Sequence, residues 1–333
     1  MSSVEIVPFN EDYVEAAAAL VAARYWAERE LGNFLLPAKF EEAEAIVPIL
    51  QDNSERTTGV AAIKEGRLVG FATGLMTMHQ EARTAYIPDW GHGAESSDRW
   101  GTYRLMYADL ASRWVANGYF THVVTFFAHE REVADAWFSL GFGLENIDAL
   151  REVGPVEGTM AGVEVRRANL EDLEVVIALT LATRRHLTTT PAFRPLFDHE
   201  GVEYYKQQLS DSDIVWWLAY QDSEVVGGMR IVPSSKRNFV LPVADESTCA
   251  ITMAFTKEKE RNRGVGTALL KHSLDWARSA GYKNCAVDFE SANIPGSRFW
   301  LKNFQPVCYS LVRRLDERIA WAHGNRNEIN FLR

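Results

Sequence analysis

The chain repeats itself at a spacing of about 160 residues, and this repeat limits the fold more than any other feature. The pair Gly118-Tyr119 recurs as Gly281-Tyr282, 163 residues later, and Trp137–Phe142 recurs as Phe299–Phe304 at a spacing of 162. Smaller matches keep the same order: Gly101 with Gly264, Trp114 with Trp276 and Arg151 with Arg313. Because a duplicated segment must form the same unit twice, the sequence predicts two similar domains. A chain of 333 residues is also longer than one core usually supports.

Each half predicts the same order of elements: a strand, one or two helices, a hairpin, a strand, a helix, a strand, a helix and a final hairpin. The first helices are expected over residues 12–30 and 170–187, where apolar residues recur at helical spacing. Between the halves, residues 154–162 are rich in glycine and contain a proline, which is typical of a linker. We therefore expect α/β domains at residues 1–153 and 163–333, joined by the linker 154–162.

Composition and charge restrict the partners of the chain. Hydrophobic residues make up 47% of the sequence, and 35 Lys+Arg stand against 45 Asp+Glu, which gives a formal net charge of -10. A globular protein of this charge repels nucleic acid and anionic membranes and attracts cationic substrates, so neither a nucleic-acid nor a membrane partner is expected. No basic leader or long apolar run is present, which favours the cytoplasm. The eight histidines show no metal-ligand spacing, so we expect no metal site.

The second half contains a glycine-bearing loop between a strand and a helix. A strand is expected over residues 249–255, and the loop Arg261–Thr267 leads directly into a helix. Leu270, Leu274 and Ala277 line one face of that helix, and Gly281 stands where a helix end is expected.

Such a loop is suited to binding an anion. The backbone N–H groups and the positive end of the helix dipole converge on one point. Gly264 and Gly266 allow the backbone to approach a pyrophosphate closely, and Arg261 and Arg263 add positive charge. The spacing excludes a P-loop, and Leu269 stands where a dinucleotide fingerprint needs its third glycine.

The pattern R-x-x-G-x-G at Arg261–Gly266 resembles motif A of the GNAT superfamily of acyl-CoA N-acyltransferases. The resemblance extends over Ala250–Phe304: Asn293 stands where that family has an asparagine after the next strand, and Phe299–Phe304 where it has Y-x-x-x-G-F. It implies two tandem GNAT-like domains, each with a mixed, mostly antiparallel sheet flanked by helices. It also implies acetyl-CoA as cosubstrate and direct transfer of its acetyl group to a primary amine on a small molecule or a protein.

Carried over by position, the resemblance assigns residues to parts of acetyl-CoA. The backbone near Ala254 would hold the thioester, the amides of residues 263–267 the pyrophosphate, and Asn293 the pantetheine arm. The residues expected to bind the cofactor are Ala254, Phe255, Thr256, Arg261, Asn262, Arg263, Gly264, Val265, Gly266, Thr267, Asn293 and Ser297.

The catalytic acid and base of the family do not carry over. The position of its tyrosine acid falls on Phe299 or Trp300, so the thiolate leaves unassisted or takes a proton through water from Ser297 or Tyr309. The position of its glutamate base falls on Ala250. The carboxylates left as candidate bases are Glu246, Asp288 and Glu290.

The first half lacks the features of the loop. Asp98–Tyr103 aligns with Arg261–Gly266, so that a carboxylate replaces the first arginine and Tyr103 replaces the second glycine. Glu130 stands in the position of Asn293. We expect no acetyl-CoA in this half. Its remodelled cleft either shapes the acceptor site, binds another ligand or serves only as a structural partner; the residues in question are Trp90, His92, Trp100 and Tyr103.

Two further interpretations of the whole chain stay open. The missing tyrosine and glutamate are compatible with a non-catalytic acyl-CoA sensor or interaction module. The glycine loop, taken alone, is compatible with a protein that binds a nucleotide or a phosphometabolite. The segment Thr188–Pro191, which follows the helix end at Arg184–His186, is expected to contact the substrate in an enzyme.

Overall fold

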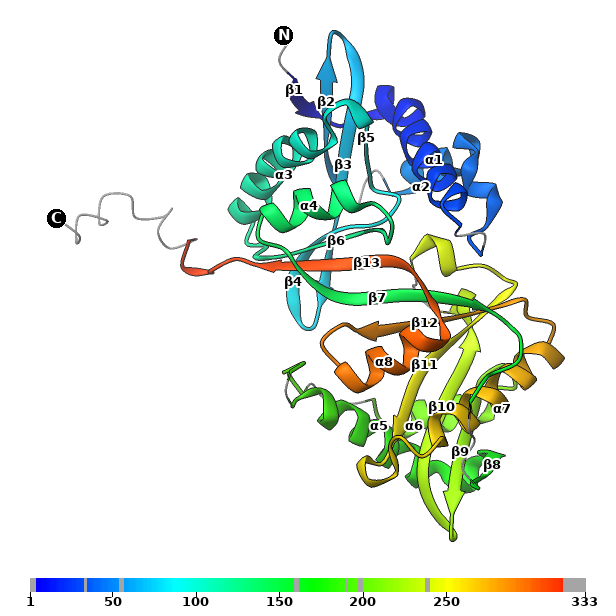
Figure 1. Ribbon diagram of the computed structural model, residues 1–333. Helices are drawn as coiled ribbons and strands as arrows, with labels where there is room; N and C mark the ends of the chain where they lie inside the picture. The colour runs from blue at the N-terminus through cyan, green and yellow to red at the C-terminus, as the bar shows by residue number, and fades with distance from the viewer. Residues whose placement is uncertain are drawn as a thin grey trace. The chain divides into compact units, whose positions relative to one another are not determined.

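The computed structural model describes residues 4–32, 35–53, 57–158, 162–189, 191–196, 200–236 and 240–319. The chain forms two compact units: unit 1 contains Met1–Glu145 with Val307–Arg333, and unit 2 contains Asn146–Pro306 (Figure 1). Both are α/β units, as the sequence predicts. In the part of the chain described here, no helix is long and apolar enough to cross a lipid bilayer.

Unit 1 is built on a sheet in the order β1-β2-β3-β4-β6-β13, with the short β5 paired to β3. Its strands are β1 (Glu5–Pro8), β2 (Thr57–Lys64), β3 (Arg67–His79), β4 (Ala82–Ile87), β5 (His92–Ala94), β6 (Thr121–Phe127) and β13 (Gln305–Arg314). Its helices are α1 (Val14–Glu30), α2 (Ala43–Asp52), α3 (Arg99–Ala116) and α4 (Arg131–Ser139). The pair β4 and β6 is parallel, and the other pairs are antiparallel.

The helices of unit 1 cover opposite faces of the sheet. A Cβ atom at Gly70 would meet Thr102 of α3, whereas one at Gly93, on the neighbouring strand, would meet Leu20 of α1. Figure 1 shows α3 and α4 together and α1 and α2 together, in agreement with their packing. The core under α3 is aromatic and includes the fully buried rings of Tyr103 and Trp137.

Unit 2 repeats this plan with a sheet in the order β7-β12-β11-β10-β9-β8. Its strands are β7 (Gly143–Glu152), β8 (Glu164–Arg167), β9 (Val215–Gln221), β10 (Glu224–Pro233), β11 (Thr248–Thr256) and β12 (Asn284–Glu290). Its helices are α5 (Leu173–Leu187), α6 (Val202–Ser210), α7 (Val265–Ser279) and α8 (Ile294–Asn303). Here β11 and β12 form the parallel pair, and the other pairs are antiparallel.

Two adjacent glycines let helices approach both faces of this sheet. A Cβ atom at Gly227 would meet Val265 of α7, and one at Gly228 would meet Leu179 of α5. Successive strand residues point to opposite faces, so α5 and α7 sandwich β10 between them. The expected glycine stop is also present, because α7 ends at Ser279 and Gly281 has a φ of 87°.

The two units begin alike, which confirms the repeat. In each, a short first strand leads to an asparagine that caps a 3-10 turn running into the first helix. Asn10 accepts from the N–H of Asp12, and Asn169 accepts from the N–H of Glu171. The resulting helices α1 and α5 cover the predicted ranges to within a few residues.

The ends of the two copies differ from the expectation. In place of a final hairpin, each copy ends in one long strand, β7 or β13. Strand β7 pairs with β12 in unit 2, and β13 pairs with β6 in unit 1. The compact units therefore do not coincide with the sequence copies, because each last strand belongs to the sheet of the other copy. Of the expected linker 154–162, residues 159–161 lie outside the described part.

Candidate functional site

The parallel strands β11 and β12 separate halfway along their length. Their pairing runs from Thr248 opposite Asn284 to Ile251 opposite Val287 and then stops. At that point β11 has a bulge: Arg230 of β10 pairs with Met253 and Ile231 pairs with Ile251, so that Thr252 is left without a partner in the register. From Met253 to Thr256, β11 pairs only with β10, so its other edge faces the opening between the strands. The expected thioester residues Ala254, Phe255 and Thr256 lie on this open edge.

Beyond the open edge, the chain turns into the N-terminus of α7. Asn262 and Gly264 both adopt positive φ, 61° and 87°, and no side chain caps the helix. The first-turn N–H groups of an α-helix have no partner within the helix. Among the described residues, no backbone carbonyl accepts from the N–H groups of Asn262, Arg263 or Gly264. The loop therefore presents unpaired donors and the positive end of the helix dipole to one point.

The two arginines of the loop differ in role. Arg261 is half-buried, and its Nε donates to the carbonyl oxygen of Thr256 at 3.2 Å, which ties the loop to the end of β11. The side chain of Arg263 is 62% exposed and forms an ion pair with Glu260 at 3.0 Å. Arg263 is therefore the side chain that can reach an anion without a loss of loop structure.

Gly266 is packed closely in the first turn of α7. A Cβ atom at this position would lie 3.3 Å from the ring of Phe299 on α8. The glycine therefore keeps the helix N-terminus unobstructed while α8 packs beside it. Val265 and Thr267, its neighbours in the predicted set, are buried and half-buried respectively.

The end of β12 is organised by Asn293 and Ser297. Asn293 is the N-cap of α8, and its side-chain oxygen accepts from the N–H of Gly296 at 3.4 Å. The hydroxyl of Ser297 donates to the carbonyl oxygens of Glu290 and Ser291 at 3.1 and 3.0 Å. Ser297 thus stabilises the turn between β12 and α8, and its proton is directed at the backbone.

The three predicted carboxylates lie in different surroundings. Glu290 is buried at the end of β12 and forms an ion pair with Arg194, which follows α5. Asp288 is exposed and lies just beyond Val287, the last residue of β12 that pairs with β11, on the same face as Glu290. Glu246 is exposed and precedes β11, at the opposite end of that strand from Thr256. At a rise of about 3.3 Å per strand residue, Glu246 lies roughly 30 Å from the end of β11 that leads to the loop.

The sequence did not identify two residues of this site. Nε2 of His186 and Oδ1 of Asn293 lie 3.2 Å apart, and Arg194 reaches Glu290. The sequence places His186 only at the end of a helix. The hydroxyls of Thr188 and Thr189 donate to carbonyls of the preceding turn, and Thr190 lies outside the described residues.

Tyr309, one of the two residues considered for the acid, is not part of this site. It lies on β13, opposite Phe126, and so belongs to unit 1. Burial and the charge of Glu28 raise the pKa of Tyr309. This follows from the exchange of the last strands, which the sequence did not reveal.

In unit 1, the corresponding helix N-terminus is closed by its own side chain. Asp98 is the N-cap of α3, and its carboxylate accepts from the N–H of Gly101 at 3.0 Å. A carboxylate therefore occupies the place where unit 2 presents free N–H groups.

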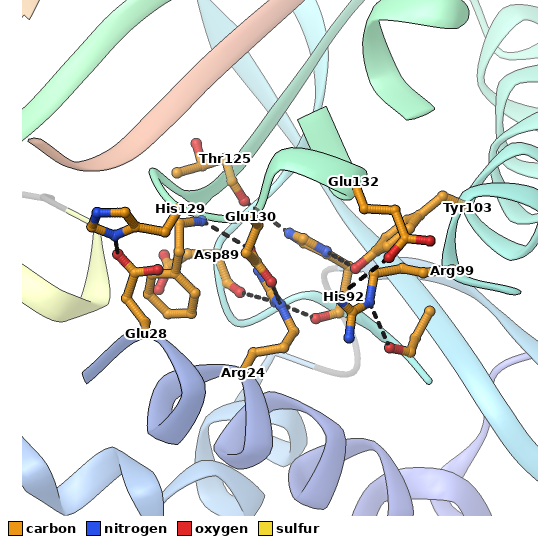
Figure 2. Close-up of polar contacts among 12 residues, drawn as sticks. Arg24, Glu28, Asp89, His92, Arg99, Tyr103, Thr125, His129, Glu130 and Glu132 are labelled. Carbon is orange, nitrogen blue, oxygen red and sulfur yellow. Dashed lines mark hydrogen bonds and ion pairs between the residues drawn. The ribbon is translucent and has the colours of Figure 1, made fainter. Parts of the chain in front are cut away.

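The opening between β4 and β6 in unit 1 is filled by a histidine. The pairing of these strands stops at Ile87 opposite Val124, and the buried ring of His92 lies beyond it (Figure 2). Its Nε2 donates to the carbonyl oxygen of Thr125 at 2.9 Å, so its Nδ1 accepts from the hydroxyl of Tyr103 at 2.7 Å. Burial, with the charge of Arg24, holds the pKa of His92 well below its usual range, so the ring stays neutral.

A buried ion pair closes the same opening from the side of α1. Nε and Nη2 of Arg24 each donate to the carboxylate of Glu130 at 2.6 Å, and Nη1 donates to the carbonyls of Asp89 and His92 (Figure 2). Burial alone would lower the pKa of Arg24, but the charge of Glu130, with Tyr103 and Asp89, raises it above its usual value. The interior of this cleft is thus occupied by protein groups.

The other two residues of the remodelled cleft stand apart from this network. Trp100 is 40% exposed, with the guanidinium of Arg104 4.1 Å from its ring centre. Trp90 is half-buried. The described residues of either unit contain no cluster of three or more histidine, cysteine or acidic side chains that could hold a metal ion.

Known proteins share the fold of this chain. Residues 184–304 match the acetyltransferase (GNAT) family, and no curated protein matches the chain. A GCN5-related N-acetyltransferase from Sphaerobacter thermophilus has a similar structure, with a TM-score of 0.57 and 13% identity over 93% of this chain and 95% of that one.

Two further solved structures are similar over nearly the whole of this chain. A tandem GNAT protein from the clavulanic acid biosynthesis pathway gives a TM-score of 0.50 and 14% identity, with 94% of this chain and 98% of that one covered. A glucosamine N-acetyltransferase region of a fungal multi-domain GH3 β-N-acetylglucosaminidase gives a TM-score of 0.55 and 13% identity over 94% of this chain. The chain spans only 38% of that longer protein. At these identities the structures establish a tandem GNAT fold for the chain, and the family match assigns residues 184–304 to the GNAT superfamily.

Proposed function

We propose that unit 2 is an acetyl-CoA-dependent N-acetyltransferase that acts on a primary amine, and that unit 1 binds no acetyl-CoA. One observation carries this proposal. The parallel strands β11 and β12 separate after Ile251 and Val287, and the open edge of β11 leads to an uncapped helix N-terminus. An extended arm ending in a pyrophosphate fits such an arrangement: the arm pairs with the strand edge, and the phosphates bind the helix end.

The expected cofactor residues divide into three groups in this arrangement. The backbone of Ala254–Thr256 pairs with the arm and polarises the thioester carbonyl, and the loop amides with Arg263 bind the pyrophosphate. Asn293 offers its side-chain Nδ2 to the arm. Arg261 and Ser297 act indirectly, since each holds a turn in place through bonds to backbone carbonyls.

The reaction proposed here is direct transfer. The amine nitrogen attacks the thioester carbonyl carbon, the C–S bond breaks, and the sulfur leaves as a thiolate. The proton of the amine must pass to a base, for which Asp288 and Glu290 are the carboxylates close to the opening. Because Glu290 is already paired with Arg194, its first role is to hold the segment that follows α5.

The acceptor class follows from charge. The chain carries a formal net charge of -10, which raises the local concentration of cations. A polyamine, an amino sugar or another small cationic amine is the acceptor that this field favours, followed by a protein amino group.

The test of this function is release of CoA thiol from acetyl-CoA with a panel containing spermidine, glucosamine and a lysine peptide. Gly266→Tyr should abolish both acetyl-CoA binding and thiol release, because its ring must enter the loop or displace Phe299. Gly143→Tyr is the matched control, since a Cβ atom there meets nothing within 4 Å. If Gly266→Tyr binds acetyl-CoA as tightly as the control, the loop is not the cofactor site.

A non-catalytic acyl-CoA sensor is the alternative, and it is favoured by Phe299 and Trp300 at the positions where the family has its tyrosine acid. Such a module would bind acetyl-CoA and release no thiol with any amine of the panel. The enzyme would bind acetyl-CoA and release CoA thiol when an acceptor amine is present.

A further inference from the structure

His186 lies in the last turn of α5 and contacts the N-cap of α8. Helix α5 packs on β10 and β11, the strands that form the open edge of the site. There, Nε2 of His186 and Oδ1 of Asn293 are 3.2 Å apart. The imidazole is half-buried, so it is held in position and still accessible to a ligand.

Asn293 determines which nitrogen of His186 carries the proton. The amide oxygen also accepts from the N–H of Gly296, as the oxygen of an N-cap side chain does, and this fixes the orientation of the amide. A carbonyl oxygen only accepts, so Nε2 of His186 must donate. In the neutral ring, Nδ1 then carries the lone pair, and no group among the described residues donates to it.

The polar groups beside His186 are engaged with other protein groups. His186 itself lies in the last turn of α5. Glu290, on the same side of the opening, is neutralised by Arg194, and the hydroxyl of Ser297 is directed at backbone carbonyls. His186 therefore offers the lone pair of Nδ1, whereas Glu290 and Ser297 are already engaged with Arg194 and with backbone carbonyls.

We propose that His186 is the general base that accepts the proton of the acceptor amine. This inference rests on the proposed function of unit 2. As the C–N bond forms and the C–S bond breaks, the electron pair of the C–S bond leaves with the sulfur, and the proton of the nitrogen moves to Nδ1. The imidazolium returns this proton to solvent, and the CoA thiolate takes one from solvent. Asn293 is the positioning residue, because it fixes the ring and its tautomer.

The first experiment measures turnover of acetyl-CoA by His186→Gln, with whichever of spermidine, glucosamine and the lysine peptide the wild type acetylates fastest. We expect kcat to fall about 10²- to 10³-fold, with acetyl-CoA affinity changed less than about twofold. Free imidazole should raise the kcat of His186→Gln at least about tenfold, because it replaces the missing base.

His272→Gln is the matched control. That histidine is also half-buried, but it bonds to its own helix α7 through Ala268. The inference is overturned if His186→Gln keeps kcat within about threefold of the control, or if imidazole restores nothing although acetyl-CoA still binds.

A second measurement does not depend on activity. Nitrogen-15 NMR of the imidazole in the full-length protein should show the Nε2–H tautomer for His186, and Asn293→Ala should allow both tautomers. A dominant Nδ1–H form in the wild type would overturn the inference. If the wild type binds acetyl-CoA but releases no thiol, the proposed function fails, while the tautomer measurement still tests the geometry separately.

Discussion

The two units place opposite chemistry at corresponding positions of one fold. At the helix N-terminus, unit 1 has the carboxylate of Asp98, whereas unit 2 has free N–H groups behind Gly264. Between the separated strands, unit 1 has the buried ring of His92, whereas unit 2 has an open edge of β11. We therefore expect an anion to bind only in the unit whose helix N-terminus and strand opening are not occupied by protein side chains.

The contact from the first helix to the N-cap of the last helix shows the same contrast. In unit 1 it is the ion pair of the buried Arg24 with the partly buried Glu130, with two bonds of 2.6 Å. In unit 2 it is one bond of 3.2 Å between His186 and Asn293. The first contact fixes a closed cleft, and the second leaves a titratable group in an open one.

Breaking the closed contact should give the largest effect. Glu130→Gln leaves the buried charge of Arg24 without its counterion, so we expect a loss of about 3–5 kcal/mol in the free energy of unfolding. Glu132→Gln on the same helix removes an exposed partner 3.8 Å from Arg99 and should cost less than about 1 kcal/mol. Urea unfolding of both variants measures the difference, and equal stabilities would show that the ion pair does not hold unit 1 closed.

Acid should destabilise unit 1 through its buried neutral histidines. Burial lowers the pKa of His122 to about 4, and the ring lies between Tyr107 and the carbonyl of Tyr119. Because this folded-state pKa is below that of the unfolded chain, the unfolded chain binds more protons as the pH falls. The stabilisation is present above about pH 6.5 and lost toward pH 4, by about 2 kcal/mol at pH 5.

The measurement is urea unfolding at pH 7 and pH 5 for the wild type and His122→Gln. The variant should lose less stability than the wild type over this range, with the remainder due to His92, whose pKa is also lowered by burial. The same loss in both proteins would contradict the assignment to His122.

Arg263 should give the smallest effect, confined to the cofactor. Arg263→Gln should weaken acetyl-CoA binding about fivefold, about 1 kcal/mol, because one exposed charge near the pyrophosphate is removed. Arg278→Gln at the other end of α7 removes an equally exposed arginine in a similar ion pair and should change affinity less than twofold, about 0.4 kcal/mol. Equal effects of the two changes would mean that the N-terminus of α7 does not bind the phosphates.

The features predicted correctly depend on residues close together in the sequence. The repeat, the first hairpin of each copy and the loop between β11 and α7 each follow from glycines, arginines and apolar periodicity within a few residues. The sequence also predicts that the first copy lacks the loop pattern, because Asp98 and Tyr103 stand in the aligned positions of Arg261 and Gly266.

The features that were missed depend on distant residues. Strands β7 and β13 are equivalent in the repeat, so the sequence pattern does not distinguish which sheet each one joins. His186 and Asn293 are 107 residues apart, and neither residue alone indicates the contact. The contact between Arg24 and Glu130, which are 106 residues apart, cannot be predicted from the local sequence either.

The most direct test of the contrast between the units is calorimetric titration of the full-length protein with acetyl-CoA. One binding site per chain, lost in Gly266→Tyr and kept in Gly143→Tyr, is the predicted result. Two sites would contradict the closure of unit 1 by Asp98, His92 and the pair of Arg24 with Glu130. No binding would contradict the assignment of the loop in unit 2 and, with it, the proposed acetyltransferase.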